Sequence, residues 1–450
     1  MNRIVITIVV LLNAILAVAI FAQDTTAIKK YYEQFGVTEI PDSLVEEAIN
    51  NSSILKLNNA ILIGLVNSPE LKARGMEINV FQASALQAEL YPNPEVGVDL
   101  ENLFGSGNYS GLSGSENTFY LTQDFVLGGR LSAGRDVELL KSDLAAWNLE
   151  RERLSLISEI RKSFTIISSL KHQNKLNKQL LEISIDFQKN LGRRTKAGKV
   201  SPAEVVRASL ISISLEITFQ NVKMKFASEI QKLKSLLGKP NLQFSSVENI
   251  SNIEYVIPKV NELRNSILNT PSLAKFKTDL KRAEAEIQLQ ESIAMPDLSL
   301  SLGYRRINET SDNAMIMGAS MPINIFNNNS GNIEKAKIRA DQTKYRYDGL
   351  LYNSEAKLTL LANNISAQSI MIKKLESESL PKARSAFKII SDGNLVGRFT
   401  VLDVLDSQRS LYELESQFVN AVAEYNRNVI ELEELTLTKF NIKARNLEYE

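Results

Sequence analysis

Residues 198–208 read GKVSPAEVVRA, and residues 397–407, which lie 199 positions later, read GRFTVLDVLDS. A glycine, a cation, an apolar residue and a hydroxyl occur in the same order in both stretches. Ser201 and Thr400 each stand three residues before an acid, which is the spacing of a capping box at the start of a helix. Pro202 suits the first position of that helix. Both stretches therefore predict a glycine turn that leads into a helix.

The same offset recurs along the chain and indicates an internal duplication. Asn-Ser-Pro at 67–69 matches Asn-Thr-Pro at 269–271 with an offset of 202, and Leu-Gly-Gly at 127–129 matches Phe-Asn-Asn at 326–328 with an offset of 199. Landmarks in a fixed order predict a repeated unit of about 200 residues, far longer than the repeats of solenoid proteins.

Composition excludes several classes of function. The 450 residues contain 52 Lys+Arg and 52 Asp+Glu, so no net charge points to nucleic acid. The chain is 44% hydrophobic with a mean hydropathy of -0.12, which is too polar for a polytopic helical membrane protein. It has no cysteine and one histidine, His172, so it offers no disulfide, no thiolate metal site and no histidine cluster. No cofactor, metal site or catalytic residue is predicted.

The N-terminus carries the most apolar run of the sequence. Arg3 precedes the apolar residues 4–22, which end in small residues, so residues 1–22 are predicted to be a secretory signal peptide cleaved after Ala22. A retained signal anchor is the alternative, because the apolar run is long.

Alternation with a period of two predicts two strand hairpins. Val96, Val98 and Leu100 alternate with polar residues, and the hairpins are expected over 95–126 and 297–325. Each strand has about the ten residues that a tilted outer-membrane strand requires. A small soluble sheet is the alternative.

Apolar positions spaced by three and four predict two long helix pairs, over 129–237 and 330–437. The helix expected from Gly129 to about Thr195 would be about 100 Å long at 1.5 Å per residue. Such helices must pack side by side as coiled coils. Four membrane strands cannot close a barrel, so several chains would have to share one.

Taken together, the signal peptide, hairpins, long helix pairs and duplicated turns resemble the TolC family of outer-membrane efflux channels. The sequence FVLGGRLSAGR at 125–135 is most similar to the CzcC-type, heavy-metal-associated branch. The resemblance implies a mainly α fold with a small β part, in which a homotrimer forms a coiled-coil α-barrel and a shared twelve-stranded transmembrane β-barrel. The expected segments are a first repeat over 23–240, a linker over 241–257, a second repeat over 258–437 and a tail over 438–450.

The resemblance also implies a function. Such a channel lies in the outer membrane, contacts its lipid and extends into the periplasm. It passively exports small molecules or metal ions delivered by an inner-membrane pump of the RND type through a periplasmic adaptor. The alternative is the outer-membrane conduit of a type I protein secretion system. A purely structural periplasmic coiled coil leaves the hairpins and the signal peptide unexplained, and an enzyme is least supported because no nucleophile elbow or phosphate loop is present.

By position in the family, the two turns fall at the periplasmic tip, where family members form the entrance and meet the adaptor. The expected tip and adaptor-docking residues are Gly198, Ser201, Pro202, Gly393, Gly397 and Thr400. Asp403 and Asp406 match acids that ring the closed entrance. Some relatives hold that entrance shut with a tyrosine and an arginine where this chain has Asn394 and Phe399, so its closing contacts are expected to differ or to be weaker.

The two acids can also be read without the family. Asp403 and Asp406 lie three residues apart, and three copies would place six carboxylates at one constriction, which favours cations and raises some carboxyl pKa values. The alternative is a solvated helix start whose acids suit the positive end of the dipole. The corresponding first-repeat residues, Glu204 and Arg207, have opposite charges, so only the second repeat can build an acidic ring.

Overall fold

The computed structural model describes residues 54–248 and 257–439. The expected signal peptide and most of the expected tail lie outside these residues. The chain divides into two compact units, and each draws on both repeats. The helical unit comprises the chain up to Lys72, Glu150–Leu273 and the chain from Leu351 onward, and the sheet unit comprises Ala73–Leu149 and Ala274–Leu350.

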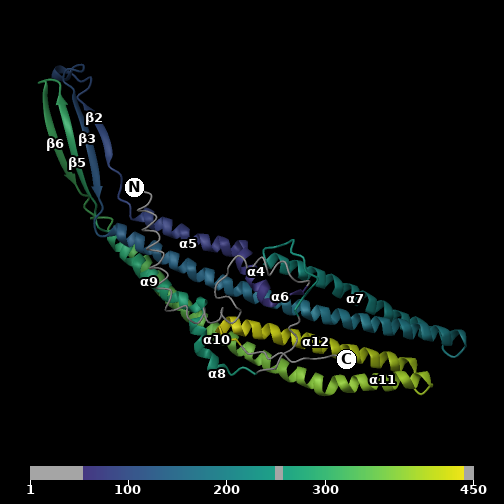
Figure 1. Ribbon diagram of the computed structural model, residues 1–450. Helices are drawn as coiled ribbons and strands as arrows, with labels where there is room; N and C mark the ends of the chain where they lie inside the picture. Colours follow the sequence, from purple (N-terminus) through teal and green to yellow (C-terminus); the bar gives the residue numbers. More distant parts are fainter. Residues whose placement is uncertain (1–53, 249–256, 440–450) are drawn as a thin grey trace. The chain divides into compact units, whose positions relative to one another are not determined.

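Helices make up most of the described chain (Figure 1). The first repeat contains α4 (Leu57–Asn67), α5 (Pro69–Ala88), α6 (Arg130–Lys196) and α7 (Pro202–Leu236), and the second contains α8 (Val260–Leu263), α9 (Pro271–Ile293), α10 (Ser330–Lys374), α11 (Leu380–Leu395) and α12 (Val401–Thr436). Among the described helices, none is both long and apolar enough to cross a bilayer.

The expected long helix pairs are confirmed, with one difference between the repeats. α6 is a single helix of 67 residues, about 100 Å long at 1.5 Å per residue, and proline is absent from it. Its counterpart is interrupted between α10 and α11 by a π-helical stretch, Leu375–Ser379, which we call the π segment. In the helical unit, α6 and α7 form a first hairpin, and α11 and α12 form a second (Figure 1).

The sheet unit contains both expected strand hairpins (Figure 1). Four antiparallel strands lie in the order β2 (Glu95–Glu101), β3 (Glu116–Phe125), β5 (Leu298–Ile307) and β6 (Asp312–Ser320). The last strand ends before the expected boundary of 325. Pro322 follows shortly after and has no N–H to donate to a ladder.

The register separates the sheet into an apolar and a polar face. Val98 pairs with Phe119, Phe119 pairs with Tyr304, and Tyr304 pairs with Met315, so these four side chains share one face. That face is exposed: Val96 is 77% and Met317 is 84% accessible. The opposite face carries acids from all but one of its strands, namely Glu95, Asp99, Glu101, Glu116, Asp124 and Asp312.

One arginine lies on the acidic face of the sheet. The guanidinium of Arg305 is 2.9 Å from Glu101, 2.7 Å from Glu116 and 2.8 Å from the Thr118 hydroxyl. It thereby ties β5 to β3 and β2. Tyr120 fills the space above Gly97 on the same face, where an added Cβ would lie only 2.3 Å from the ring.

A two-stranded parallel pair in the helical unit joins the first residues that the structure describes to the segment that follows the first hairpin. β1 (Ile54–Leu55) pairs with β4 (Ser246–Val247), which lies in the expected linker 241–257. Gly238 ends the first hairpin close to the C-terminus of α4. Its φ is +64°, and a Cβ there would lie 2.5 Å from the carbonyl oxygen of Asn67. Only glycine combines this backbone angle with so close an approach.

Candidate functional site at the helix tips

The two glycine turns close with the same hydrogen bonds. In the first, Gly198 N–H donates to Thr195 O (2.9 Å) and Lys199 N–H donates to Arg194 O (2.9 Å). In the second, Gly397 N–H donates to Asn394 O (3.1 Å), and the next residue donates to Gly393 O (2.8 Å). This is the Schellman motif. The two glycines have φ values of +70° and +77°, so the duplicated sequence forms a duplicated turn.

The two helix caps beyond these turns differ. Thr400 and Asp403 form the complete expected capping box: Asp403 N–H donates to the threonine hydroxyl (3.2 Å), and Asp403 Oδ2 accepts from Thr400 N–H (2.7 Å). At the start of α7, Ser201 instead accepts from Ala203 N–H (3.3 Å), and Pro202 occupies the first helical turn. The first repeat therefore has a simple cap, and the expectation of a matching capping box there is wrong.

The expected gate acids have different environments in the single chain. Asp403 Oδ2 also accepts from the Thr400 hydroxyl (2.7 Å). The hydrogen bonds from the Thr400 side chain and backbone lower the pKa of the Asp403 carboxyl. Asp406, one turn further along α12, is exposed. Asp403 thus belongs to the helix cap, whereas the carboxylate of Asp406 faces solvent.

The two hairpins meet through a polar contact near their tips. Arg194 Nη1 donates to Asn394 Oδ1 (3.0 Å), and Asn394 Nδ2 donates to Phe399 O (2.9 Å). The side chain of Asn394 is buried, with the residue 2% exposed. The sequence identified Asn394 and Phe399 as departures from the family. It gave no signal for Arg194, because at the offset of 199 this residue corresponds to Gly393 and not to Asn394.

Apolar packing accompanies this contact. Leu191, Ala208, Val401 and Leu405 form a buried cluster between the hairpins. Above it, Phe399 covers Gly393, where an added Cβ would lie 2.5 Å from the aromatic ring. Gly393 is therefore required for the close approach of Phe399. The expected tip residues Gly198, Ser201, Pro202, Gly397 and Thr400 all lie in the two turns or at the first residues of the helices that follow.

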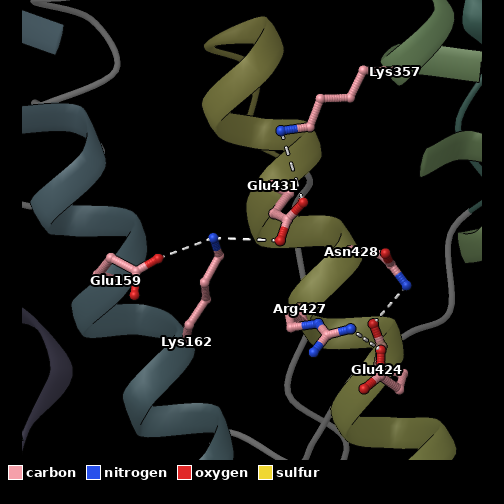
Figure 2. A network of polar contacts seen from close by, with 7 residues as sticks. All are labelled: Glu159, Lys162, Lys357, Glu424, Arg427, Asn428 and Glu431. Carbon is pink, nitrogen blue, oxygen red and sulfur yellow. Dashed lines mark hydrogen bonds and ion pairs between the residues drawn. The ribbon is translucent and has the colours of Figure 1, made fainter. Parts of the chain in front are cut away.

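Further from the tips, a layer of ion pairs joins α12 to α6 and α10 (Figure 2). Lys162 Nζ lies 3.2 Å from Glu159 and 3.4 Å from Glu431, and Lys357 lies 3.9 Å from the second oxygen of Glu431. Burial alone would lower the pKa of Lys162, but the charges of Glu431 and Glu159 outweigh it and raise that pKa. We call these residues the ion-pair layer.

A more deeply buried pair belongs to the same level. Arg161 of α6 contacts Glu433 of α12, and their side chains are 7% and 0% exposed. Burial lowers the pKa of the nearby Lys439, against the opposing effect of Glu433. Charges this far from solvent are tolerated because they are paired. The sequence gave no signal for the pairs that join α6 to α12, because Lys162 and Glu431, like Arg161 and Glu433, are more than 250 residues apart.

The described residues show no arrangement suited to metal chemistry. No group of three or more His, Cys, Asp or Glu among them could hold a metal ion. His172 Nδ1 lies 2.9 Å from Ser168 O within its own helix. The tips thus combine two turns, two helix caps and contacts that join the hairpins.

Comparison with known proteins gives a consistent picture. A family model described as outer membrane efflux protein matches residues 63–239 and 263–436, which together make up more than half of the chain. The cobalt-zinc-cadmium resistance protein CzcC of Cupriavidus metallidurans is 26% identical over 370 residues, covering 82% of this chain and 87% of the relative. The pyoverdine export outer membrane protein OpmQ of Pseudomonas aeruginosa is 23% identical and covers 88% and 84%.

The fold is also found among solved structures. CusC, described in connection with transmembrane channel formation, superposes with a TM-score of 0.69 at 16% identity, covering 86% of this chain and 93% of that chain. At this level of identity, the likeness concerns the fold.

Proposed function

The chain belongs to the outer membrane efflux protein family, and from this premise we propose that three copies form the outer-membrane channel of a tripartite efflux system. It is a channel protein and not an enzyme. The sheet carries the proposal, because its apolar face is exposed along its length and its outer strands each have a partner on one side only within the described chain. Sheet edges are not tolerated within a bilayer. Three such sheets would close a shared barrel.

In this arrangement the polar face of the sheet lines the pore. Its six acidic residues outnumber its one basic residue, Arg305, so the lining would attract cations. A cationic cargo fits the similarity to CzcC, a cobalt-zinc-cadmium resistance protein. We therefore favour divalent metal ions as substrate. Pyoverdine-like small molecules are the second candidate, because OpmQ is also similar. Neither relative favours protein secretion.

Transport through the channel would be passive, with the driving force supplied by an inner-membrane pump of the RND type. A periplasmic adaptor would dock at the two tip turns. The turns support this assignment because the charged side chains of Lys199 and Arg398 in them are exposed. Asp403 and Asp406 of three chains would border the entrance, with Asp406 directed to solvent and Asp403 closing the helix cap.

Fractionation and conductance test the proposal together. Crosslinking of intact cells should give a trimer in the outer-membrane fraction, and the purified trimer should give cation-selective currents in planar bilayers. A monomer in the inner membrane would contradict the assignment. Zinc, cobalt and cadmium tolerance, measured with and without the gene, separates metal export from export of other small molecules.

A further inference from the structure

The apolar face of the sheet changes composition along β5. In chain order, the side chains of β5 on that face are Leu298, Leu300, Leu302, Tyr304 and Arg306. Three leucines are thus followed by an aromatic residue and then by a cation near the end of the strand. In membrane barrels, an apolar band is bounded by aromatic residues at the level of the lipid headgroups. The order of side chains on β5 therefore matches a strand that leaves the hydrocarbon at Tyr304 and reaches the headgroups at Arg306.

The two adjacent arginines of β5 have opposite surroundings. Arg305 lies on the acidic face and is paired with two carboxylates, as described above. Arg306 lies on the apolar face, where its Nη1 donates to the carbonyl of Ser311 and to Asn313 Oδ1 (3.2 Å). Both acceptors are uncharged. Within the part of the chain that the structure describes, no carboxylate forms an ion pair with Arg306, so its charge is not neutralised there.

The missing countercharge is not available from the sheet of a second copy either. On the four strands that the structure describes, every acidic residue lies on the opposite face, and Arg306 is the one charged residue on the apolar face. β5 is flanked by β3 and β6 of its own chain (Figure 1). A copy joined at the edges of the sheet would therefore be separated from Arg306 by a whole strand, and its own apolar face would be equally free of acids. The countercharge has to come from outside the protein.

The end of the sheet that carries Arg306 is well defined. Asn308 extends the ladder beyond β5, because its backbone N–H donates to Ser115 O (3.0 Å) and its side chain donates to Ser115 Oγ (2.7 Å). Helices α5, α6, α9 and α10 all connect to the opposite ends of the strands. With these helices on the periplasmic side, as in the proposed function, Arg306 lies at the outer leaflet. A cation on the lipid face costs far less there than at the middle of the bilayer.

We propose that Arg306 binds the phosphate group of an anionic lipid in the outer leaflet. Asn117 and Asn313 pair with Arg306 on the two neighbouring strands, so two amide side chains lie on the same face beside the guanidinium. A guanidinium has five N–H donors, and its fork matches two oxygens of a phosphate. The contacts to Ser311 and Asn313 use Nη1, which leaves Nε and Nη2 for the lipid. This inference rests on the proposed function for the orientation of the sheet in the membrane.

Lipid binding by the purified native trimer tests the site without requiring transport. In neutral detergent, native mass spectrometry would count bound phosphorylated lipid A and, in a parallel titration, lipid A from which the phosphates have been removed. We expect the trimer to bind the phosphorylated form about tenfold more tightly, because the charged contact is lost with the phosphate. Arg306→Gln should abolish this preference. Arg306→Lys should retain part of it, because lysine keeps the charge but lacks the planar fork.

The matched control is Arg305→Gln, which removes the same charge from the adjacent residue on the opposite face and should keep the preference. Arg398→Gln, at an exposed arginine of a tip turn, takes its place if the loss of the Arg305 contacts prevents assembly. Equal affinity of the wild-type trimer for the two lipids would overturn the proposal, and so would an equal loss of preference in the control.

A competition experiment separates a lipid site from a site for free phosphate. Inorganic phosphate at the concentration of the lipid should not displace phosphorylated lipid A, and displacement would overturn the assignment to a lipid. A trimer that conducts ions but shows no preference between the lipids would overturn this inference alone. Recovery of the protein outside the outer membrane would instead overturn the proposed function.

Discussion

Arg194, two residues before the end of α6, donates a 3.0 Å hydrogen bond to the side chain of Asn394, one residue before the end of α11. The bond joins the first repeat to the second at the tips of the two hairpins. Asn394 Nδ2 in turn donates a 2.9 Å hydrogen bond to the backbone carbonyl of Phe399 in the turn. The cation of this contact thus comes from the first hairpin, and the amide oxygen that accepts its hydrogen bond comes from the second.

Removal of this contact should favour opening. In Arg194→Ala, a buried amide oxygen loses its charged donor, which costs about 1.5–3 kcal/mol of the closed state. We expect bilayer recordings to show at least a tenfold rise in opening frequency. Arg193→Ala is the matched control, because Arg193 is exposed and adjacent on the same helix. The same rise in both variants would show that net charge, not the contact, is responsible.

Replacement of Asp403 and replacement of Asp406 by asparagine should have different effects. Asp406→Asn removes an exposed charge, so we expect reduced cation selectivity and weaker block by trivalent cations, with the trimer intact. Asp403→Asn should in addition destabilise the first turn of α12, because the Asp403 carboxylate accepts two hydrogen bonds from Thr400. Reversal potentials in a salt gradient measure selectivity. Glu204→Gln is the control, because the sequence places the opposite charge of Arg207 three residues from Glu204. Equal changes of ion selectivity in all three variants would mean that Asp403 and Asp406 are ordinary solvent-exposed acids at the start of a helix.

The turn glycines should be sensitive to any side chain. Gly198 and Gly397 have φ values of +70° and +77°, and an L-residue there costs roughly 1–2 kcal/mol. A bulky residue such as leucine should impair efflux while trimers still reach the outer membrane. Gly192→Ala is the control, because it lies inside α6 with open space around its Cβ position. Loss of the trimer in Gly397→Leu would mean that the glycine serves folding alone.

The buried pair should contribute more to stability than any exposed pair. Glu433→Gln leaves Arg161 in a site where its side chain is 7% exposed, at a cost of about 3–5 kcal/mol. Glu424→Gln, which breaks the more exposed contact to Arg427 (Figure 2), should cost about 0.5 kcal/mol. The thermal midpoint of the purified protein compares the two. Similar midpoints in both variants would contradict the structural role of the buried pair.

Alkaline pH should weaken the ion-pair layer. The pKa of Lys162 is raised above its ordinary 10.5 in the folded chain, so its contribution is fully present below pH 10.5 and is lost as pH rises through the higher folded value. Lys162→Met should therefore flatten the fall of the thermal midpoint above pH 10.5. Lys259→Met is the control, because Lys259 is exposed and its pair with Glu262 is local. An unchanged pH profile in Lys162→Met would contradict this prediction.

The sequence alone determined the elements whose signals are local. The glycine turns were predictable because φ values near +70° require glycine, and the long helices because apolar spacing continues without proline through α6. The alternation of Val96 and Val98 with polar residues fixed the faces of the sheet, since successive side chains of a strand point to opposite sides. The duplication and the position of Asp403 in a capping box followed from spacing in the same way.

Tertiary structure decided the contacts between distant segments. Arg161 and Glu433 are 272 residues apart, and nothing near either residue shows that the other will neutralise it. Arg194 and Asn394 likewise meet only because two hairpins from different repeats pack on the cluster around Leu191. The π segment needed both kinds of information: Pro381 marks a break in the ladder, but only packing of Leu375 and Leu380 on one buried face selects a π turn over a kink. Local patterns specify backbone conformation, whereas pairing of buried charges and choice of helix register depend on which surfaces come together.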